Sequence, residues 1–404
     1  KKILFRTLLA LLLICVLGTL VLSLPAVQTK LAQYVTKRVN KEFNTDMNID
    51  KLRVSLISWD TAVEGVLIRD YEKDTLFYIN ELKTSILSVG NLASGKLEFG
   101  AIDVDKLDFN LTTYKDSTDT NLEVFVDKLD DGKPREKGTP PFFMSSSSIT
   151  IASSTFVMTN ENLKNKKILD FSDLNIQASD FQIVGPEVNL SINDMSFDSG
   201  RGIHVDRMRT DFKYTKEQMR FDSLNIETPG SLLNGNLVFN YDRKDFRDFF
   251  NLVKLDAQFV DSKVAFDEIN LVYDQFGKGK EVTFSSNLSG VLNDLNTEDL
   301  FLLSDNTGIR GDFNFKNLFD RNEGFIMDAK MKNVTSSYYQ LRALMPNILG
   351  KTLPPSIFKK LGQFTIRGNA LVTETSIEAK VNINTAIGSS YTDLTLTDVN
   401  NIDN

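Results

Sequence analysis

Residues able to carry out acid–base or nucleophilic chemistry are scarce in this chain. The 404 residues include one histidine, His204, and one cysteine, Cys15. A Ser–His–Asp triad and a Cys–His pair both need a histidine as the base, and Cys15 lies within an apolar run. His204 stands between Ile203 and Val205, an alternation that predicts an exposed position on a strand. The sequence therefore argues against a nucleophilic enzyme.

Phosphate-binding and metal-binding motifs are not recognised either. The basic turn at residues 277–280 lacks the spacing of a phosphate loop. Asp116, Asp119, Asp130 and Asp131 do not follow the pattern of a calcium loop. A glycosidase-like carboxylate pair would require two of the 54 acidic residues to be distinguished from the rest, and a solvated face explains nearly all of them. We predict no catalytic residue, no cofactor and no metal site.

Composition limits the class of partner. The formal net charge of −8 argues against nucleic acid, which requires a basic face. No cysteine lies outside residues 3–24, so no disulfide framework is expected. Phe is abundant at 29 and Pro is scarce at 9, a mixture that suits many strands joined by polar turns.

Most of the chain alternates apolar and polar residues with a period of two. Leu107, Phe109 and Leu111, for example, alternate with Asp108 and Asn110. This pattern predicts antiparallel strands with one apolar and one wet face. The chain holds roughly 25 such runs. They are residues 47–56, 62–69, 75–87, 96–99, 102–113, 122–126, 149–157, 167–171, 174–178, 181–184, 187–192, 203–205, 208–214, 219–221, 223–227, 235–241, 255–260, 264–266, 269–273, 281–288, 309–316, 324–332, 363–371, 376–382 and 390–396.

The segments between these runs divide the chain. Residues 242–253 predict a short helix after a strand. The predicted organisation is a membrane anchor at 1–25, an amphipathic helix at 26–44, a first sheet segment at 45–129, a loop or linker at 130–148, a second sheet segment at 149–336, a helical insert at 337–362 and further strands at 363–404. Because repeat arrays usually need a capping element, we expect strands to continue beyond residue 404 in the full-length protein.

Residues 3–24 predict a transmembrane helix. They span roughly 33 Å at the α-helical rise, enough to cross a hydrocarbon core, and no charge follows Leu8 before Pro25. The anchor residues are Leu8, Leu12, Ile14, Leu17, Leu20 and Leu24. A cleavable signal peptide or a lipoprotein signal at Cys15 are the alternatives. Basic residues flank both ends, so charge alone does not fix the orientation, and we expect the long body outside the cytoplasm.

Residues 26–43 predict an amphipathic helix that ends near Asn44. Apolar residues recur at three- and four-residue steps from Val27 to Phe43, with four basic residues on other faces. One interpretation is a helix lying near anionic headgroups. The other, which we favour, is a plug over the open end of the following sheet.

The long apolar sheet face also has two interpretations. It is either a closed core packed against itself or an open groove that holds lipid acyl chains. Abundant Phe and Leu, and few helices to cover the face, favour the groove. Its predicted lining residues are Leu107, Phe109, Leu111, Val124, Val126, Phe266 and Leu271.

Several short motifs resemble TamB-like proteins of the AsmA-like superfamily, of the type found in Bacteroidota. They lie at residues 24–28, 66–70, 74–76, 344–346, 361–362, 366–369 and 385–388. The resemblance covers the N-terminal portion of such proteins and lacks their C-terminal region. It implies a single-pass inner-membrane protein with a periplasmic body, whose elongated, twisted β-groove conducts phospholipids between the inner and outer membranes.

Two other functions stay open at this point. The same resemblance implies a scaffold for assembly of outer-membrane and secreted proteins with an outer-membrane barrel partner, through a region outside this chain. A surface β-solenoid acting on polysaccharide is the third hypothesis. An intact anchor in the mature protein would argue against this last alternative.

Overall fold

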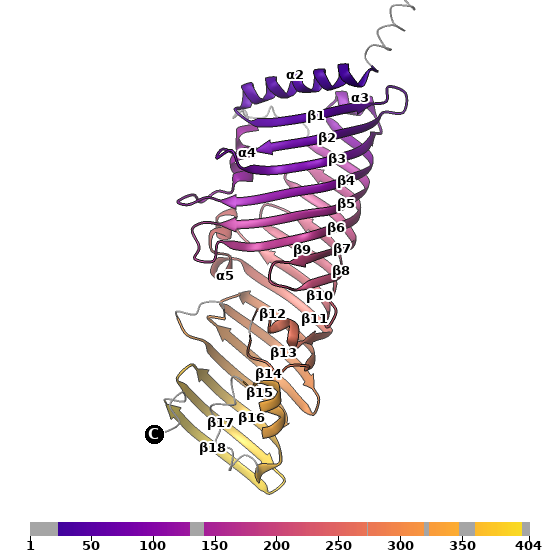
Figure 1. The fold of residues 1–404 in the computed structure, drawn as a ribbon. Helices are drawn as coiled ribbons and strands as arrows, with labels where there is room; N and C mark the ends of the chain where they lie inside the picture. The colour runs from indigo at the N-terminus through magenta and orange to yellow at the C-terminus, as the bar shows by residue number, and fades with distance from the viewer. Residues whose placement is uncertain (1–22, 130–140, 273, 319–322, 347–359, 398–404) are drawn as a thin grey trace, which may run out of the picture. The chain divides into compact units, whose positions relative to one another are not determined.

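A computed structural model describes residues 23–129, 141–272, 274–318, 323–346 and 360–397 (Figure 1). These residues form a mainly β structure with 18 strands and few helices. The chain divides into two compact units, Lys1–Gly200 and Arg201–Asn404. No helix of the described residues is long and apolar enough to cross a membrane, and all but the last two residues of the predicted span at 3–24 lie outside them.

Unit 1 holds a seven-strand sheet in which every strand pairs with its neighbour in sequence. Its strands are β1 (Asp46–Val54), β2 (Asp60–Arg69), β3 (Thr75–Ile86), β4 (Lys96–Thr113), β5 (Phe143–Asn160), β6 (Lys167–Val184) and β7 (Glu187–Ser199). Its helices are α2 (Pro25–Phe43), α3 (Val89–Ala93) and α4 (Asn121–Leu129). All pairs are antiparallel except β4 with β5, which are parallel.

Unit 2 holds an eleven-strand sheet in which all the pairs between successive strands are antiparallel. Its strands are β8 (His204–Tyr214), β9 (Gln218–Glu227), β10 (Leu232–Asn240), β11 (Lys254–Ala265), β12 (Glu281–Val291), β13 (Asp294–Ser304), β14 (Thr307–Lys316), β15 (Ile326–Ser337), β16 (Gln363–Thr373), β17 (Ser376–Thr385) and β18 (Gly388–Thr397). Its helices are the 3-10 helix η1 (Arg243–Asp248), α5 (Phe249–Leu252), α6 (Phe266–Ile269) and α7 (Tyr338–Leu344).

Helix α2 confirms the amphipathic helix predicted at 26–43. Pro25 occupies its first turn, where a missing N–H costs nothing. Asn44 ends it in the left-handed conformation at φ 51°, and the Asn44 N–H bonds to the carbonyl of Asn40. In Figure 1 the helix runs along β1, the first strand of the sheet.

The polar side of α2 covers the edge of β1. Three α2 side chains each bond to both the N–H and the C=O of one β1 residue, so they replace a neighbouring strand. The pairs are Gln28 with Val54, Thr29 with Leu52 and Asn40 with Met47, at distances between 2.8 and 3.3 Å. The sequence led us to expect the apolar stripe in this role. Instead, the middle of that stripe is exposed, with Leu31 at 56% and Tyr34 at 65%, whereas Val27, Val39 and Phe43 are half-buried.

A recurring bend interrupts many strands. At each bend a non-glycine residue adopts the left-handed conformation, which is uncommon and needs local support. These residues include Lys106, Ser153, Asp173, Ser223, Asp261 and Asp299. A side chain of the next strand often accepts the hydrogen bond of the bent residue's N–H. Such pairs are Ser153 with Asn175, Ser223 with Asn236, Asp261 with Ser285 and Asp299 with Asp312, all between 2.9 and 3.0 Å.

The difference between the 18 strands and the roughly 25 predicted from the alternating runs arises partly because single strands were predicted as several. Runs 96–99 and 102–113, which are separated at Gly100, belong to the single strand β4. Three further predicted strands, within 167–184, are the single strand β6, which bends at Asp173 and Asp180. A bend interrupts the alternation of apolar and polar residues, so the sequence of one bent strand has the pattern of two or three shorter strands.

Two predicted strands are wrong. Residues 122–126 lie in helix α4, because three apolar residues at steps of two are too few to distinguish a strand from a helix. Residues 269–272 hold the end of α6 and the turn that follows it, and residue 273 is not described. Strand β13 was missed, because the left-handed Asp299 interrupts its alternation.

The predicted linker at 130–148 is shorter than expected. Strand β5 already begins at Phe143, while residues 130–140 lie outside the described part. The antiparallel arrangement predicted throughout is also wrong for β4 and β5. Parallel neighbours need a long crossover, and the segment containing α4 provides it. The predicted helices at 242–253 and 337–362 are represented by η1 with α5 and by α7, and residues 347–359 are not described.

Candidate functional site

Apolar side chains in unit 1 line up in two rows across the strands. In the aliphatic row each member pairs with the next across all seven strands. Its members are Leu52, Val63, Leu82, Val104, Ile151, Ile176 and Met195. In the aromatic row the paired members are Met47, Ile68, Phe77, Phe109, Phe156 and Phe171.

Both rows lie on one face, here called the apolar face of unit 1. The bend at Lys106 makes this possible. In β4 the exposed residues Asp103, Asp105 and Lys106 reverse the alternation, so that Val104 and Leu107 both lie on the covered side. A regular strand would send two residues three positions apart to opposite faces.

The phenylalanine rings of the aromatic row contact one another in sequence. The ring centroids of Phe77 and Phe109 are 4.3 Å apart and stacked, and Phe156 follows at 5.2 Å from Phe109. Phe171 lies 5.9 Å from Phe156, and Phe197 of β7 lies 4.2 Å from Phe171. Each ring is close enough to the next for direct contact, so the five rings form one continuous aromatic surface.

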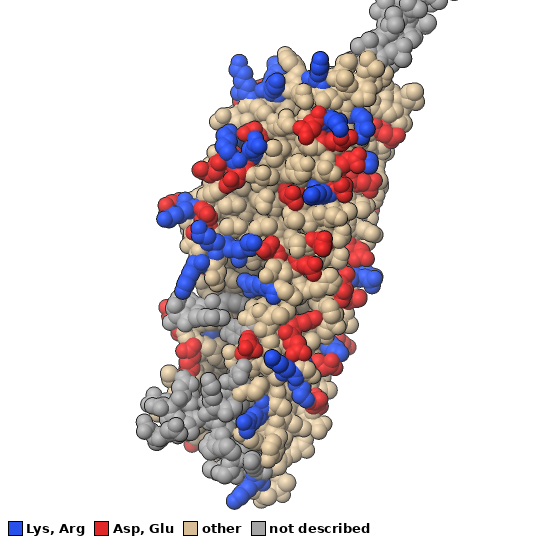
Figure 2. Space-filling view, in the orientation of Figure 1, with Lys and Arg blue, Asp and Glu red and all other residues tan. Residues whose placement is uncertain are grey.

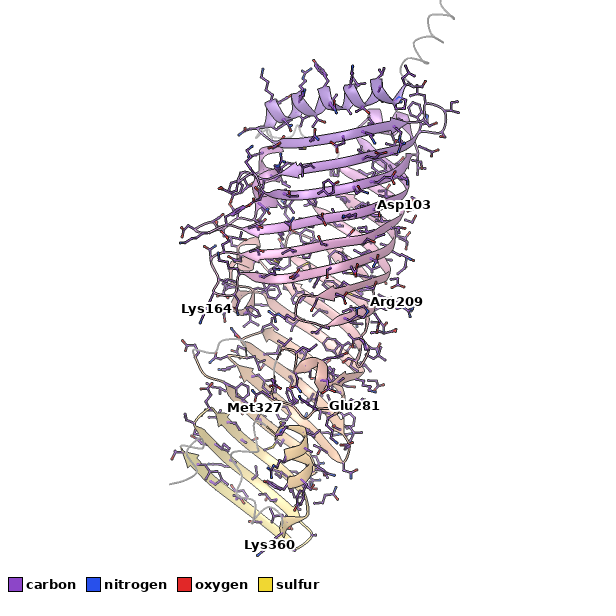
Figure 3. All side chains as sticks on the ribbon, in the orientation of Figure 1. Asp103, Lys164, Arg209, Glu281, Met327 and Lys360 are labelled. Atoms are coloured by element: carbon purple, nitrogen blue, oxygen red, sulfur yellow. The ribbon has the colours of Figure 1, made fainter. Side chains whose placement is uncertain are left out.

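Unit 2 carries a similar row across its eleven strands. Its members, each paired with the next, are Tyr214, Met219, Phe239, Leu255, Gly290, Leu295, Phe315, Met327, Val372, Ile377 and Leu396. Met327 of β15 is labelled in Figure 3. The alternation predicted from sequence thus produces an extended apolar face in each unit.

These rows are only partly buried. The five rings of the unit 1 series are all half-buried, and so are most members of the unit 2 row. By contrast, Phe266, Val282 and Leu344 are buried together in a compact cluster in unit 2. Apolar surface that is contiguous and partly exposed commonly marks an interaction site.

The opposite face of unit 1 is charged. Lys51 lies 2.7 Å from Glu64, which also pairs with Arg53. The hydrogen bond from Lys51, followed by the nearby positive charges, lowers the pKa of the Glu64 carboxyl. In unit 2 the backbone N–H of Asp299 and the ammonium of Lys332 lower the pKa of Asp312. Such exposed ion pairs contribute little to stability, but they make the surfaces that carry them hydrophilic.

A partly buried polar cluster, in which Asp70 and Asn121 are buried and Asp74 is exposed, fixes the β2–β3 turn against the start of α4. The Tyr114 hydroxyl lies 2.7 Å from Asp70 Oδ2 and 2.8 Å from Asp74 Oδ2. Asn121 Nδ2 donates to the same Asp70 oxygen at 2.9 Å. Burial, and then these two carboxylates, raise the pKa of Tyr114 well above its usual value. Each polar atom serves another protein group, so we assign the cluster a structural role.

A cavity of about 240 Å³ lies beside this cluster. Two of the three basic residues that line it, Lys73 and Lys128, already have protein partners, and the third is Arg69. Lys73 pairs with Asp46 at 3.3 Å, and Lys128 donates to the carbonyl of Asn44 at 3.1 Å. We therefore infer no ligand from this cavity.

The residues that were predicted to line a lipid groove do not all lie on one surface. Leu107, Phe109 and Leu111 lie on β4, paired with residues of the apolar face. Val124 and Val126 lie on helix α4, and Val126 is 48% exposed. Phe266 belongs to the compact cluster of unit 2, and Leu271 lies in the turn after α6 at 50% exposure.

The predicted anchor residues lie mostly outside the described part. Leu8, Leu12, Ile14, Leu17 and Leu20 are not described, and Leu24 is the N-cap of α2 with 52% exposure. The sequence did not single out Phe77, Phe156, Phe171 or Phe197. Their strands were predicted, but the strand register that joins them is a long-range property.

Groups with catalytic or metal-binding potential are sparse in the described ranges. No three His, Cys, Asp or Glu side chains within these ranges are grouped to hold a metal ion. His204 lies on β8 with a side chain 49% exposed, which confirms its predicted position. Its Nε2 is 3.3 Å from Asp206 Oδ1.

Neither the known protein-family models nor the curated proteins contain a match to this chain. The resemblance to TamB-like proteins therefore rests on the short sequence motifs alone and stays a prediction.

Proposed function

We propose that the protein carries phospholipids between the inner and outer membranes, with their acyl chains on the apolar faces of the two units. Residues 3–24 anchor the chain in the inner membrane, and the strands lie in the periplasm. The observation that carries the proposal is the partly buried aromatic series from Phe77 to Phe197.

The length of the rows favours a path over a single binding pocket. Neighbouring strands are about 4.8 Å apart, so the seven-strand aliphatic row of unit 1 extends over about 29 Å. A bilayer hydrocarbon core is about 30 Å thick, and one acyl chain covers about half of it. A single acyl chain therefore occupies only part of the row and can move along it while staying on an apolar surface.

The two faces of the sheet divide the roles. The apolar face offers stacked rings without fixed polar partners, which suits acyl chains of varied length. The opposite face, with its pairs around Glu64, interacts with water. The resemblance to TamB-like proteins supports the same function and cellular location.

Photo-crosslinking within cells tests the proposal. The photoreactive analogue benzoylphenylalanine replaces Phe109 in one variant and the exposed Asp103 in the matched control (Figure 3). We expect phospholipid adducts, identified by mass spectrometry, at Phe109 and not at Asp103. Equal lipid labelling at both positions would contradict the proposal, and protein adducts alone at Phe109 would favour the assembly scaffold instead.

A further inference from the structure

We propose that the outer face of α2 docks on the surface of an anionic bilayer. The outer face is defined by the exposed residues Leu24, Lys30, Leu31, Tyr34, Val35, Lys37, Arg38, Lys41 and Glu42. This inference does not depend on lipid movement along the apolar rows, because it concerns a different surface.

The orientation of α2 is opposite to that of an ordinary surface helix. A helix on a globular protein normally turns its apolar stripe toward the core. Here the hydrogen bonds of Gln28, Thr29 and Asn40 hold the polar side against β1. As a result Leu31 and Val35, one helical turn apart, stay 56% and 50% exposed. Three side chains fix the helix in this rotation, so the exposure is a built feature.

The charge of the outer face indicates what covers it. The chain as a whole is acidic, at −8, yet α2 carries four basic residues and one acidic residue. Figure 2 shows Lys and Arg side chains gathered along α2. Apolar residues flanked by Lys and Arg are typical of helices that lie in the headgroup region of anionic membranes. Tyr34 fits this setting, since its ring is apolar and its hydroxyl is polar.

The position of α2 in the chain agrees with this occupant. The helix follows directly after the apolar residues 3–24, so a bilayer that holds this segment is within reach of α2. Because α2 is bonded along β1, its docking sets the orientation of the first strand relative to the bilayer.

Fluorescence quenching tests the docking. In the full chain Cys15→Ser removes the natural cysteine, and Leu31→Cys or, as control, Asp103→Cys carries an environment-sensitive fluorophore. The labelled chain is reconstituted in vesicles of phosphatidylcholine, alone or mixed with phosphatidylglycerol, that contain nitroxide-labelled lipid. We expect stronger quenching at position 31 than at 103, and a marked decrease when phosphatidylglycerol is omitted.

A charge series tests the basis of the interaction. Each basic residue near an anionic surface strengthens binding roughly fivefold. The triple variant Lys30→Gln, Lys37→Gln, Lys41→Gln should therefore lower the docked-to-undocked ratio on the order of 100-fold. The matched control Lys164→Gln, Lys216→Gln, Lys254→Gln changes the net charge equally at exposed positions that are not part of α2 and should leave the ratio unchanged.

Three results would overturn the inference. They are a label at position 31 that is no more quenched than the label at 103, equal quenching in neutral and anionic vesicles, and equal effects of the two triple variants. If the outer face binds a protein partner and not a bilayer, the label at position 31 should be no more quenched than the label at 103, because the vesicles contain no other protein. Circular dichroism checks that each variant is folded. The Leu31→Cys measurement changes no charge and decides the matter even if a triple variant does not fold.

Discussion

A single charge on the aromatic row should stop lipid movement without unfolding the protein. We choose Phe109→Glu, because Phe109 lies between the rings of Phe77 and Phe156 on a long central strand. The change places a carboxylate on the apolar face. In the lipid-free protein this face is partly exposed, so the carboxylate can keep much of its water.

The cost to folding and the cost to function therefore differ. Loss of two aromatic contacts, each about 0.5–1.5 kcal/mol, predicts a stability loss of about 1–3 kcal/mol. When an acyl chain covers position 109, the carboxylate loses water without gaining a partner, which costs several kcal/mol. A barrier raised by about 3 kcal/mol slows passage about 100-fold.

The assay measures transfer of a fluorescent phospholipid from vesicles that hold the protein to acceptor vesicles. Phe109→Leu retains an apolar side chain and should transfer lipid at a rate close to that of the natural protein. Gln182→Glu adds the same charge at an exposed position of β6 and should also transfer normally. Thermal unfolding of all three variants separates slow transfer from poor folding.

Normal transfer by a folded Phe109→Glu variant would refute the reasoning. It would mean that lipid does not pass over this part of the row. Slow transfer by Gln182→Glu to the same degree would refute it equally, because the effect would then follow net charge and not position.

Two further predictions concern stability. Tyr114→Phe removes the hydroxyl shared by two carboxylates and should cost about 1–3 kcal/mol. The raised pKa of Tyr114 favours the neutral phenol in the fold. That stabilisation is present below pH 10.0, the usual tyrosine pKa, and is lost as the pH rises above it, so the variant should show a weaker alkaline loss of stability. Gly235→Ala would place a Cβ 2.0 Å from the carbonyl oxygen of Gln258 and should cost more than about 2 kcal/mol in thermal unfolding, whereas Gly308→Ala has open space.

The predictions for Tyr114→Phe and Gly235→Ala can each be contradicted by one measurement. An unchanged alkaline unfolding profile in Tyr114→Phe would show that the phenol does not govern stability in this range. Equal unfolding temperatures for Gly235→Ala and Gly308→Ala would show that the β10–β11 pair does not approach as closely as the structure indicates.

Local patterns were enough to predict most strands and the helix at 26–43. The period of two in Leu107, Phe109 and Leu111 comes from neighbours in sequence, so it is visible without the fold. The bends were not predictable in this way. Asp261 and Asp299 are ordinary turn residues in the sequence, and only the side chains that accept their N–H groups on the next strand distinguish a bend from the end of a strand.

The candidate site was only partly predictable for a related reason. Apolar residues on one strand can be identified from that strand, but a row requires the register of every neighbour. Phe109 was predicted, whereas Phe156 and Phe171 joined it only through the pairings of β4 with β5 and β5 with β6. Phe266 matched the same pattern, yet a short helix places it in a closed cluster.

The bends also explain how long strands keep one apolar face. In a regular strand, residues an odd number of positions apart lie on opposite faces. A bend adds one residue to this count, so the apolar residues before and after it can lie on the same face. At Lys106 an extra outward residue restores the apolar side, so Val104 and Phe109 share a face although they are five positions apart. The chemical requirement is small: one residue that tolerates the left-handed conformation and one acceptor on the next strand. Asp and Ser residues meet it at several bends, so the repeat is clear in the structure and difficult to recognise in the sequence.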